Sequence, residues 1–187
     1  MDEAYLVGVD TLWTIGHSIR PWEAFVAMLQ EADIHAVADV RRFAGSRRHP
    51  QYSADTMAQA LPELAIDYLP MSALGGRRCP LPDSPNTAWR SDSFRGYADY
   101  MQTVGYQDAR DRLAELAREK RIAVMCAEAV WWRCHRALVS DDFKAHGWEV
   151  IHLSALGRSE EHPYTSAAQV VDGKLSYAAA PPQPGLF

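Results

Sequence analysis

The residues that decide the fold are TLWTIGHSIRPWEAFVAMLQEADIHAVADV, at positions 11–40. Positions 11–16 are rich in β-branched and aromatic residues and predict a strand. Pro21 suits the first turn of a helix, and apolar residues then recur at helical spacing through Leu29. A second, apolar strand is expected at 35–40. This strand–helix–strand unit predicts two parallel strands in one sheet.

The same alternation continues along the rest of the chain. We expect helices at about 53–64 (with Ser53 as N-cap), 94–103, 106–119 and 133–146, strands at 66–69, 121–125 and 148–152, and a hairpin at 170–175 on an Asp-Gly turn. Residues 70–93 are rich in Gly, Pro and Ser and predict a long loop suited to covering a binding site. The pattern predicts an α/β fold: an open, mostly parallel, Rossmann-like sheet with helices on both faces and a small C-terminal hairpin. We expect one domain over 1–178 and a flexible Pro-rich tail over 179–187.

The composition is that of an ordinary globular protein. With 48% hydrophobic and 23% charged residues, the 187-residue chain is a poor candidate for disorder or for a coiled coil. No apolar run approaches the roughly 20 residues of a membrane span, so we expect no membrane partner. An odd number of cysteines (Cys79, Cys126 and Cys134) without a signal peptide indicates a reducing cytoplasm. The net charge of −5 argues against nonspecific coating of nucleic acid.

Polar and reactive side chains follow the predicted strands at the points where the strands end. They are His17 and Ser18 after the first strand, Asp39 and Arg41 at the second, Cys126 and Glu128 after the fourth, then Arg133, Cys134, His135 and Arg136, and His152 after the fifth. The carboxyl ends of parallel strands meet at one edge of a sheet, where open α/β proteins bind their ligands. We therefore expect these side chains to converge on one cleft.

Cys126 is the first candidate nucleophile. It ends an apolar strand and faces the start of a helix, where backbone N–H groups stabilise a thiolate, so we expect it to be the most acidic and most reactive thiol. Asp39 is the alternative nucleophile or base. His17, Glu128 and His135 are the candidates for proton transfer.

Other interpretations of the same cysteine stay open. The spacing from Cys126 to Arg133 departs by one residue from the cysteine phosphatase loop and lacks its glycines, which leaves phosphatase-like chemistry and a buried inert cysteine as alternatives. Cys126, Cys134 and His135 are also metal-ligand types, with Cys79 as a distant fourth. Adjacent side chains diverge by about 100° on a helix, however, which makes one ion shared by Cys134 and His135 awkward. We assign no metal and leave the cofactor open.

Arginines gather in segments that carry aromatic residues. All but Lys120, Lys144 and Lys174 of the 19 basic residues are arginine, whose planar fork binds phosphate at two points. The candidate substrate-binding residues are Ser18, Arg41, Arg47, Arg48, Arg77, Arg78, Arg95, Tyr97, Arg133 and Arg136. Cations interleaved with aromatic rings are typical of loops that hold phosphates and stack on bases. The alternative is a set of solvated basic faces that pair only with acidic neighbours.

Several of these short motifs also occur, in this order, in a known family. They are Thr14–Ser18, Ala38–Arg41, Ser46–Arg48, Leu74–Arg78, Phe94–Met101, Met125–Glu128 and Arg133–Arg136. Over roughly residues 12–157 the chain resembles the domain of unknown function 488 family. The resemblance implies an α/β fold and a polar site built from these segments. It implies no established substrate.

The last five residues, Gln183-Pro184-Gly185-Leu186-Phe187, fit the pattern Gln-x-x-Leu-Phe. This pattern is similar to the segments with which bacterial replication and repair proteins bind a sliding clamp. A Pro-rich leash that presents Gln183 and the apolar anchors Leu186 and Phe187 suits such a groove. The alternative is a terminus that packs against its own domain.

We therefore expect a cytoplasmic protein that acts on, or binds, nucleic acid or nucleotides in DNA maintenance. As an enzyme it would be a hydrolase or transferase that holds phosphates with its arginines. Whether it is catalytic stays open. The alternatives are a non-catalytic nucleotide or nucleic-acid recognition module, and a thiol-dependent, phosphatase-like enzyme that acts on small molecules.

Overall fold

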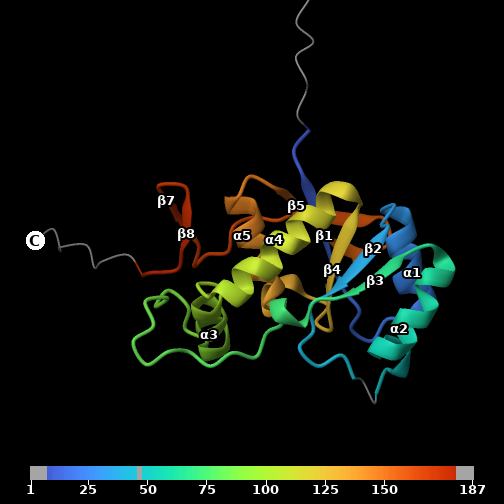
Figure 1. Cartoon of the computed structure of the whole chain (residues 1–187), viewed down its shortest axis with the longest axis horizontal. Coiled ribbons are helices and arrows are strands. Elements are labelled where there is room, and N and C mark those ends of the chain that lie inside the picture. Colours follow the sequence, from blue (N-terminus) through green and yellow to red (C-terminus); the bar gives the residue numbers. More distant parts are fainter. Residues whose placement is uncertain (1–7, 46–47, 180–187) are drawn as a thin grey trace, which may run out of the picture.

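A six-stranded sheet forms the centre of the protein. The structure, a computed structural model, describes residues 8–45 and 48–179 (Figure 1). The strands are β1 (Thr11–Gly16), β2 (Ala36–Asp39), β3 (Asp67–Pro70), β4 (Ile122–Cys126), β5 (Glu149–Ala155) and β6 (Arg158–Glu161), in the spatial order β3-β2-β4-β1-β5-β6. All neighbouring pairs are parallel except β5 and β6. The predicted α/β fold with a mostly parallel sheet is confirmed.

Helices cover both faces of this sheet. They are α1 (Trp22–Glu31), α2 (Ala54–Ala60), α3 (Asp92–Tyr100), α4 (Val104–Glu119) and α5 (Arg136–Ala145). Figure 1 shows α1 and α2 on one side of the strands and α3, α4 and α5 on the other. A hairpin of β7 (Gln169–Val171) and β8 (Lys174–Ser176) follows, as predicted from the Asp-Gly turn. The N-cap at Ser53 is also confirmed, because its hydroxyl accepts a hydrogen bond from the Thr56 backbone.

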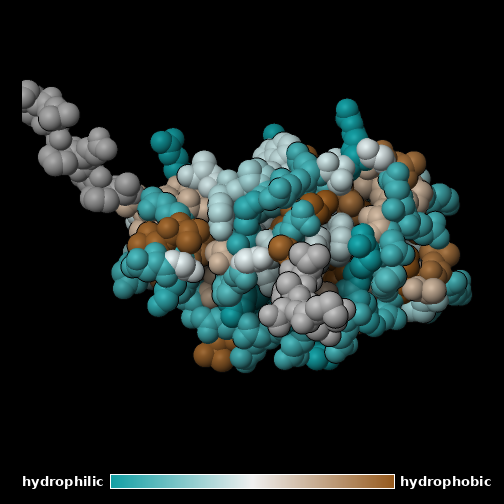
Figure 2. All heavy atoms as spheres, turned by 90° about the horizontal axis from the view of Figure 1, so that it is seen from above, coloured by the Kyte–Doolittle hydropathy of each residue, from teal (hydrophilic) through white to brown (hydrophobic). Residues whose placement is uncertain are grey.

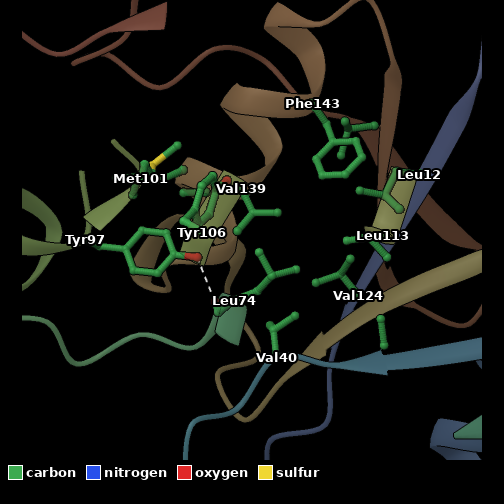
Figure 3. Packing of buried hydrophobic residues seen from close by; sticks show 14 of the residues in the cluster. Leu12, Val40, Leu74, Tyr97, Met101, Tyr106, Leu113, Val124, Val139 and Phe143 are labelled. Carbon is green, nitrogen blue, oxygen red and sulfur yellow. Dashed lines mark hydrogen bonds between the residues drawn. The ribbon is translucent and has the colours of Figure 1, made fainter. Parts of the chain in front are cut away.

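Alternation along the buried strands divides the core into two layers. Val37 packs with the side chains of α1 and α2, whereas its neighbours Ala36 and Ala38 belong to the layer beneath α3, α4 and α5. Figure 3 shows part of this second layer, where the hydroxyl of Tyr97 donates a 2.7 Å hydrogen bond to the carbonyl of Leu74. This bond ties α3 to the loop after β3, so the long segment over 70–93 is anchored to the core at its start.

Two elements differ from the sequence prediction. Strand β6 was not predicted, because all four of its residues are polar and exposed and it gains its structure by antiparallel pairing with β5. Helix α5 begins at Arg136 rather than near Arg133. The preceding residues Trp131–Arg133 form a short 3-10 turn, and Cys134 after them is extended.

On the face that Figure 2 shows, hydrophilic side chains predominate and apolar ones form small groups. Within the described ranges, no helix combines the length and the apolar character needed to cross a membrane.

Candidate functional site

Strands β1, β2 and β4 end side by side. Gly16 lies in register with Cys126, and Asp39 with Met125. Just beyond, the backbone N–H of His17 donates to the carbonyl of Cys126 at 3.0 Å. Gly16 is required here because a Cβ at this position would overlap the carbonyl oxygen of Glu128. The segment after β4 therefore crosses closely over the end of β1, and residues from three strands meet at one edge.

Two adjoining cavities open at this edge. One, of about 180 Å³, is lined by Arg41, Arg42 and Phe43, and the other, of about 720 Å³, by residues that include Ser18, Glu128, Trp132, Arg133 and Cys134. Both share Gly76, Arg77, Cys126, Ala127 and His135. The two cavities form a continuous depression, which we call the carboxyl-edge cleft. The long loop after β3 supplies one wall of it.

Arg41 lines the smaller cavity and pairs with Asp39, whereas Asp39 and His17 line neither cavity. Asp39 is 2% exposed and accepts hydrogen bonds from Arg41 Nε at 2.8 Å and Nη2 at 2.6 Å. The Tyr68 hydroxyl donates a further bond to Asp39 at 2.6 Å. Both carboxylate oxygens are thus occupied. Asp39 is placed to position Arg41, and we no longer assign it the role of nucleophile or base.

His17 is held as a neutral imidazole by the same ion pair. Arg41 Nη1 lies 3.2 Å from His17 Nε2, and His17 Nδ1 lies 2.9 Å from the Ser18 carbonyl. Because a guanidinium only donates, Nε2 accepts and Nδ1 carries the proton. Burial, together with the charge of Arg41, lowers the pKa of His17 to about 4.

Cys126 and Cys134 form a coupled pair of thiols. A hydrogen bond between them, with burial, raises the pKa of Cys126, while the same bond lowers the pKa of Cys134 despite its burial. His135 and Arg136 favour the Cys134 thiolate further. These directions favour Cys134, rather than the predicted Cys126, as the more acidic thiol. Cys134 precedes His135, the N-cap of α5, and its Sγ lies 3.6 Å from His135 Nδ1.

Cys134 and His135 also lie closer together than predicted. Cys134 is extended, with φ −129° and ψ 151°, and the helical geometry begins only at His135. The 100° divergence expected of neighbours on a helix does not apply, and both side chains turn toward Cys126. Cys79, the suggested distant ligand, is exposed and lies outside this cluster.

Three exposed arginines line the cleft. They are Arg42, Arg77 and Arg133, and none of them forms an ion pair with a carboxylate in the described part of the chain. Arg42 Nη1 donates to the carbonyl of Arg77 at 2.9 Å, and the guanidinium of Arg77 lies 5.6 Å from the ring centroid of Phe43. Of the two further predicted arginines in this region, Arg48 is exposed without lining either cavity, and Arg47 lies outside the described residues.

Other predicted ligand residues instead have partners within the fold. Arg78 lies 3.5 Å from the ring centroid of Tyr100 and donates to the carbonyl of Gly75. Arg95 pairs with Asp92 on its own helix. Tyr97 is fully buried, and its hydroxyl donates to the carbonyl of Leu74. These contacts explain the residues as parts of the scaffold, so we leave them out of the ligand site.

Arg136 is also a scaffold residue, at one end of a buried polar chain. It is 1% exposed and donates to the Glu128 carbonyl and to Thr14 Oγ1. Thr14 Oγ1 lies 2.6 Å from His152 Nδ1, and His152 Nε2 lies 2.9 Å from His162 Nδ1. This series of hydrogen-bonded side chains ends at Asp141, whose carboxylate lies 2.9 Å from His162 Nε2. This network links the interior of α5 to the backbone of the cleft.

The remaining predicted residues differ in accessibility. Glu128 is exposed, and its Oε1 accepts a bond from the Val130 backbone. Ser18 lines the larger cavity with a left-handed backbone, φ 48°. The tail residues Gln183, Leu186 and Phe187 lie outside the described residues.

The candidate binding residues did not include the two aromatic side chains that the cleft exposes, although Phe43 belongs to the arginine-rich segment for which stacking was predicted. Phe43 is 63% and Trp132 is 56% exposed, and each lines one of the two cavities. The signal for both was their position next to arginines, in the segments that follow β2 and β4.

The fold and the cleft together define an α/β protein with a ligand site at the carboxyl edge of a parallel sheet. Residues 21–143 match the family model of a domain of unknown function, DUF488, and the chain belongs to that family. No curated protein and no solved structure matches the chain.

Proposed function

We propose that this protein binds a nucleotide or a nucleic-acid strand in the carboxyl-edge cleft. The observation that carries the proposal is the combination of unpaired guanidinium groups and exposed aromatic rings. Arg42, Arg77 and Arg133 would take phosphate oxygens, because a guanidinium without a carboxylate partner is free to donate two parallel bonds. Phe43 and Trp132 would stack on bases.

Unpaired bases suit this cleft better than a duplex does. Stacking on an aromatic side chain needs a base whose face is free, which a single strand or a free nucleotide provides. The net charge of −5 does not oppose this, since it describes the whole chain, whereas the cleft itself is lined by Arg42, Arg77 and Arg133. We therefore favour single-stranded nucleic acid or a nucleotide as the ligand.

A hydrolase or transferase acting at the bound nucleotide would draw on the coupled thiols. The lowered pKa of Cys134 favours it over Cys126 as the nucleophile, whereas the lowered pKa of His17 and the bonds at both of its ring nitrogens make His17 a weak base. A non-catalytic recognition module would use the same cleft without turnover. Product formation from a bound nucleotide separates the two.

Replacing Arg42 and Arg77 by alanine should weaken binding of a fluorescent single-stranded oligonucleotide about tenfold or more. Each phosphate contact releases counterions, so the slope of log affinity against log salt concentration should also become shallower by about 1 to 2. Fluorescence anisotropy at several salt concentrations measures both quantities.

Arg112→Ala is the matched control. Arg112 is exposed on α4, pairs with Glu115 and lies outside the cleft, so its removal should change neither affinity nor slope. Equal binding by the control and the double variant would show that the cleft arginines are a solvated face, and so would contradict the proposal.

We further propose that the protein works in the cytoplasm, in DNA maintenance. Three free cysteines support a reducing compartment, and the Gln-x-x-Leu-Phe pattern at 183–187 supports contact with a sliding clamp. Neither setting follows from the cleft itself.

Alanine at Leu186 and Phe187 should abolish association with a bacterial sliding clamp, because these residues are the apolar anchors of the pattern. Replacing Pro184 and Gly185, at the unspecified positions, should leave association unchanged. A titration by surface plasmon resonance into the high micromolar range measures both. If the unaltered chain shows no binding there, the pattern is a coincidence.

A further inference from the structure

We propose that Cys126, Cys134 and His135 bind one divalent metal ion of the zinc type. One donor atom from each residue lies within 4.8 Å of the other two. Two thiolates and an imidazole are ligands that Zn²⁺ prefers, and three protein ligands with an open fourth position are typical of zinc sites that take part in chemistry. This site does not use the arginines of the cleft, and an ion bound there would exclude Cys134 from the role of nucleophile considered above.

The local backbone brings the three ligands together. Cys126 is the last residue of β4, and the short 3-10 turn Trp131–Arg133 returns the chain so that Cys134 lies beside it. The break in conformation between Cys134 and His135 then directs both side chains to the same point. A continuous helix through these residues would have separated them.

The spacing of the donor atoms matches a tetrahedral ion. With Zn–S about 2.3 Å and Zn–N about 2.0–2.1 Å, a tetrahedral angle separates sulfur from nitrogen by about 3.6 Å. The observed distance from Cys134 Sγ to His135 Nδ1 is 3.6 Å. The third donor, Cys126 Sγ, is within 4.8 Å of both, so small side-chain rotations bring it to the required distance.

Space for an ion is kept at the imidazole. A Cβ at Gly76 would lie 2.8 Å from His135 Nδ1, so the absence of a side chain at this position leaves the nitrogen accessible. The other ring nitrogen, Nε2, is buried and has no hydrogen-bond partner among the described residues. Neither nitrogen of His135 is thus committed to a strong bond within the fold.

Charge balance favours an ion at this point. Metal binding releases the thiol protons, and a divalent cation neutralises the two thiolates that it binds. The fourth position would face the larger cavity, where Ser18 and Glu128 also lie. Only one consequence rests on the proposed function: an ion here would lie next to phosphate held by Arg77 and Arg133.

The test uses cobalt as a spectroscopic substitute for zinc. Full-length protein, stripped with a chelator and kept reduced, is titrated with Co²⁺ alone. We expect saturation at one ion per chain, with thiolate-to-cobalt charge-transfer absorption and the intense visible bands of tetrahedral Co²⁺. Zn²⁺ should displace the cobalt and bleach both signals. Absence of the charge-transfer band in the unaltered protein overturns the proposal.

Variants assign the ligands. Cys126→Ser and Cys134→Ser should each lower the affinity for Co²⁺ about 100-fold or more, whereas Cys79→Ser, on an exposed cysteine outside the cluster, should not change it. Gly76→Ala keeps all three ligands and should lower affinity about tenfold by crowding Nδ1, which covers the case in which a cysteine variant fails to fold. Circular dichroism checks folding. Cobalt signals that survive in Cys126→Ser or vanish in Cys79→Ser contradict the assignment, whatever the outcome for oligonucleotide binding.

Discussion

Asp141→Ala should lower the free energy of unfolding by about 3–5 kcal/mol, because it removes the acceptor of a completely buried cluster. Asp141 is 0% exposed, and its carboxylate accepts bonds from Thr165 N and Oγ1, from the Tyr177 hydroxyl and from His162 Nε2, at 2.6–2.9 Å. Alanine leaves these donors unsatisfied in the core and adds a cavity. Equilibrium unfolding in urea measures the loss.

The matched control is Asp111→Ala on α4. Asp111 also pairs with a cation, Arg110, but its side chain is 63% exposed, so the change should cost no more than about 1 kcal/mol. If Asp141→Ala costs as little as this control, the buried cluster contributes nothing measurable to stability.

The consequence of losing Asp141 extends to the cleft. Asp141 holds His162, and the polar chain continues through His152 and Thr14 to Arg136, which binds the Glu128 carbonyl. Stability and the shape of the cleft are therefore linked in this protein. We expect substitutions in this buried network of polar residues to weaken ligand binding, even though none of its five side chains lines the cleft.

The convergence of polar residues at the strand ends was predictable from the sequence. It depends only on strand order and direction, and residues 11–16, 36–39 and 122–126 are apolar enough to identify as buried strands. The one strand that escaped, β6, has no apolar residue, because an edge strand exposed throughout needs none.

The partners of individual side chains were not predictable. A sequence does not tell whether Asp39 faces a ligand or Arg41, since both outcomes place it at the same strand end. The lowered pKa of Cys134 depends first on its hydrogen bond with Cys126 and then on His135 beside it, and these contacts cannot be read from the spacing of the residues in the sequence. The sequence placed His152 among the residues at the strand ends but did not predict its partners, Thr14 and His162. Asp141 gave no signal because it lies within a predicted helix, where a polar residue is ordinarily exposed.

Acid should destabilise this protein well above the pH at which its carboxylates titrate. Burial lowers the pKa of His17 to about 4 and that of His152 to about 2, from the ordinary 6.5. The charge of Arg41 lowers the pKa of His17 further, and the charge of Arg136 does the same for His152. His162 adds to the effect on His152, and Asp39 opposes it at His17. The unfolded chain therefore binds protons below pH 6.5 that the folded chain excludes, so stability is complete above that pH and falls as the pH drops toward 4.

We expect the free energy of unfolding to fall by about 1–2 kcal/mol for each pH unit between pH 6 and pH 4. This is less than the sum for two completely buried imidazoles, because His17 lies beside the cleft and keeps some access to water. Urea unfolding at a series of pH values gives this slope. The double variant His17→Asn, His152→Asn should be less stable at pH 7 yet show a much flatter slope, whereas His35→Asn, at a histidine whose side chain is half exposed, should keep the original one. If the double variant and the unaltered protein show the same slope, other groups cause the acid sensitivity. His17 and His152 would then not be held neutral in the fold.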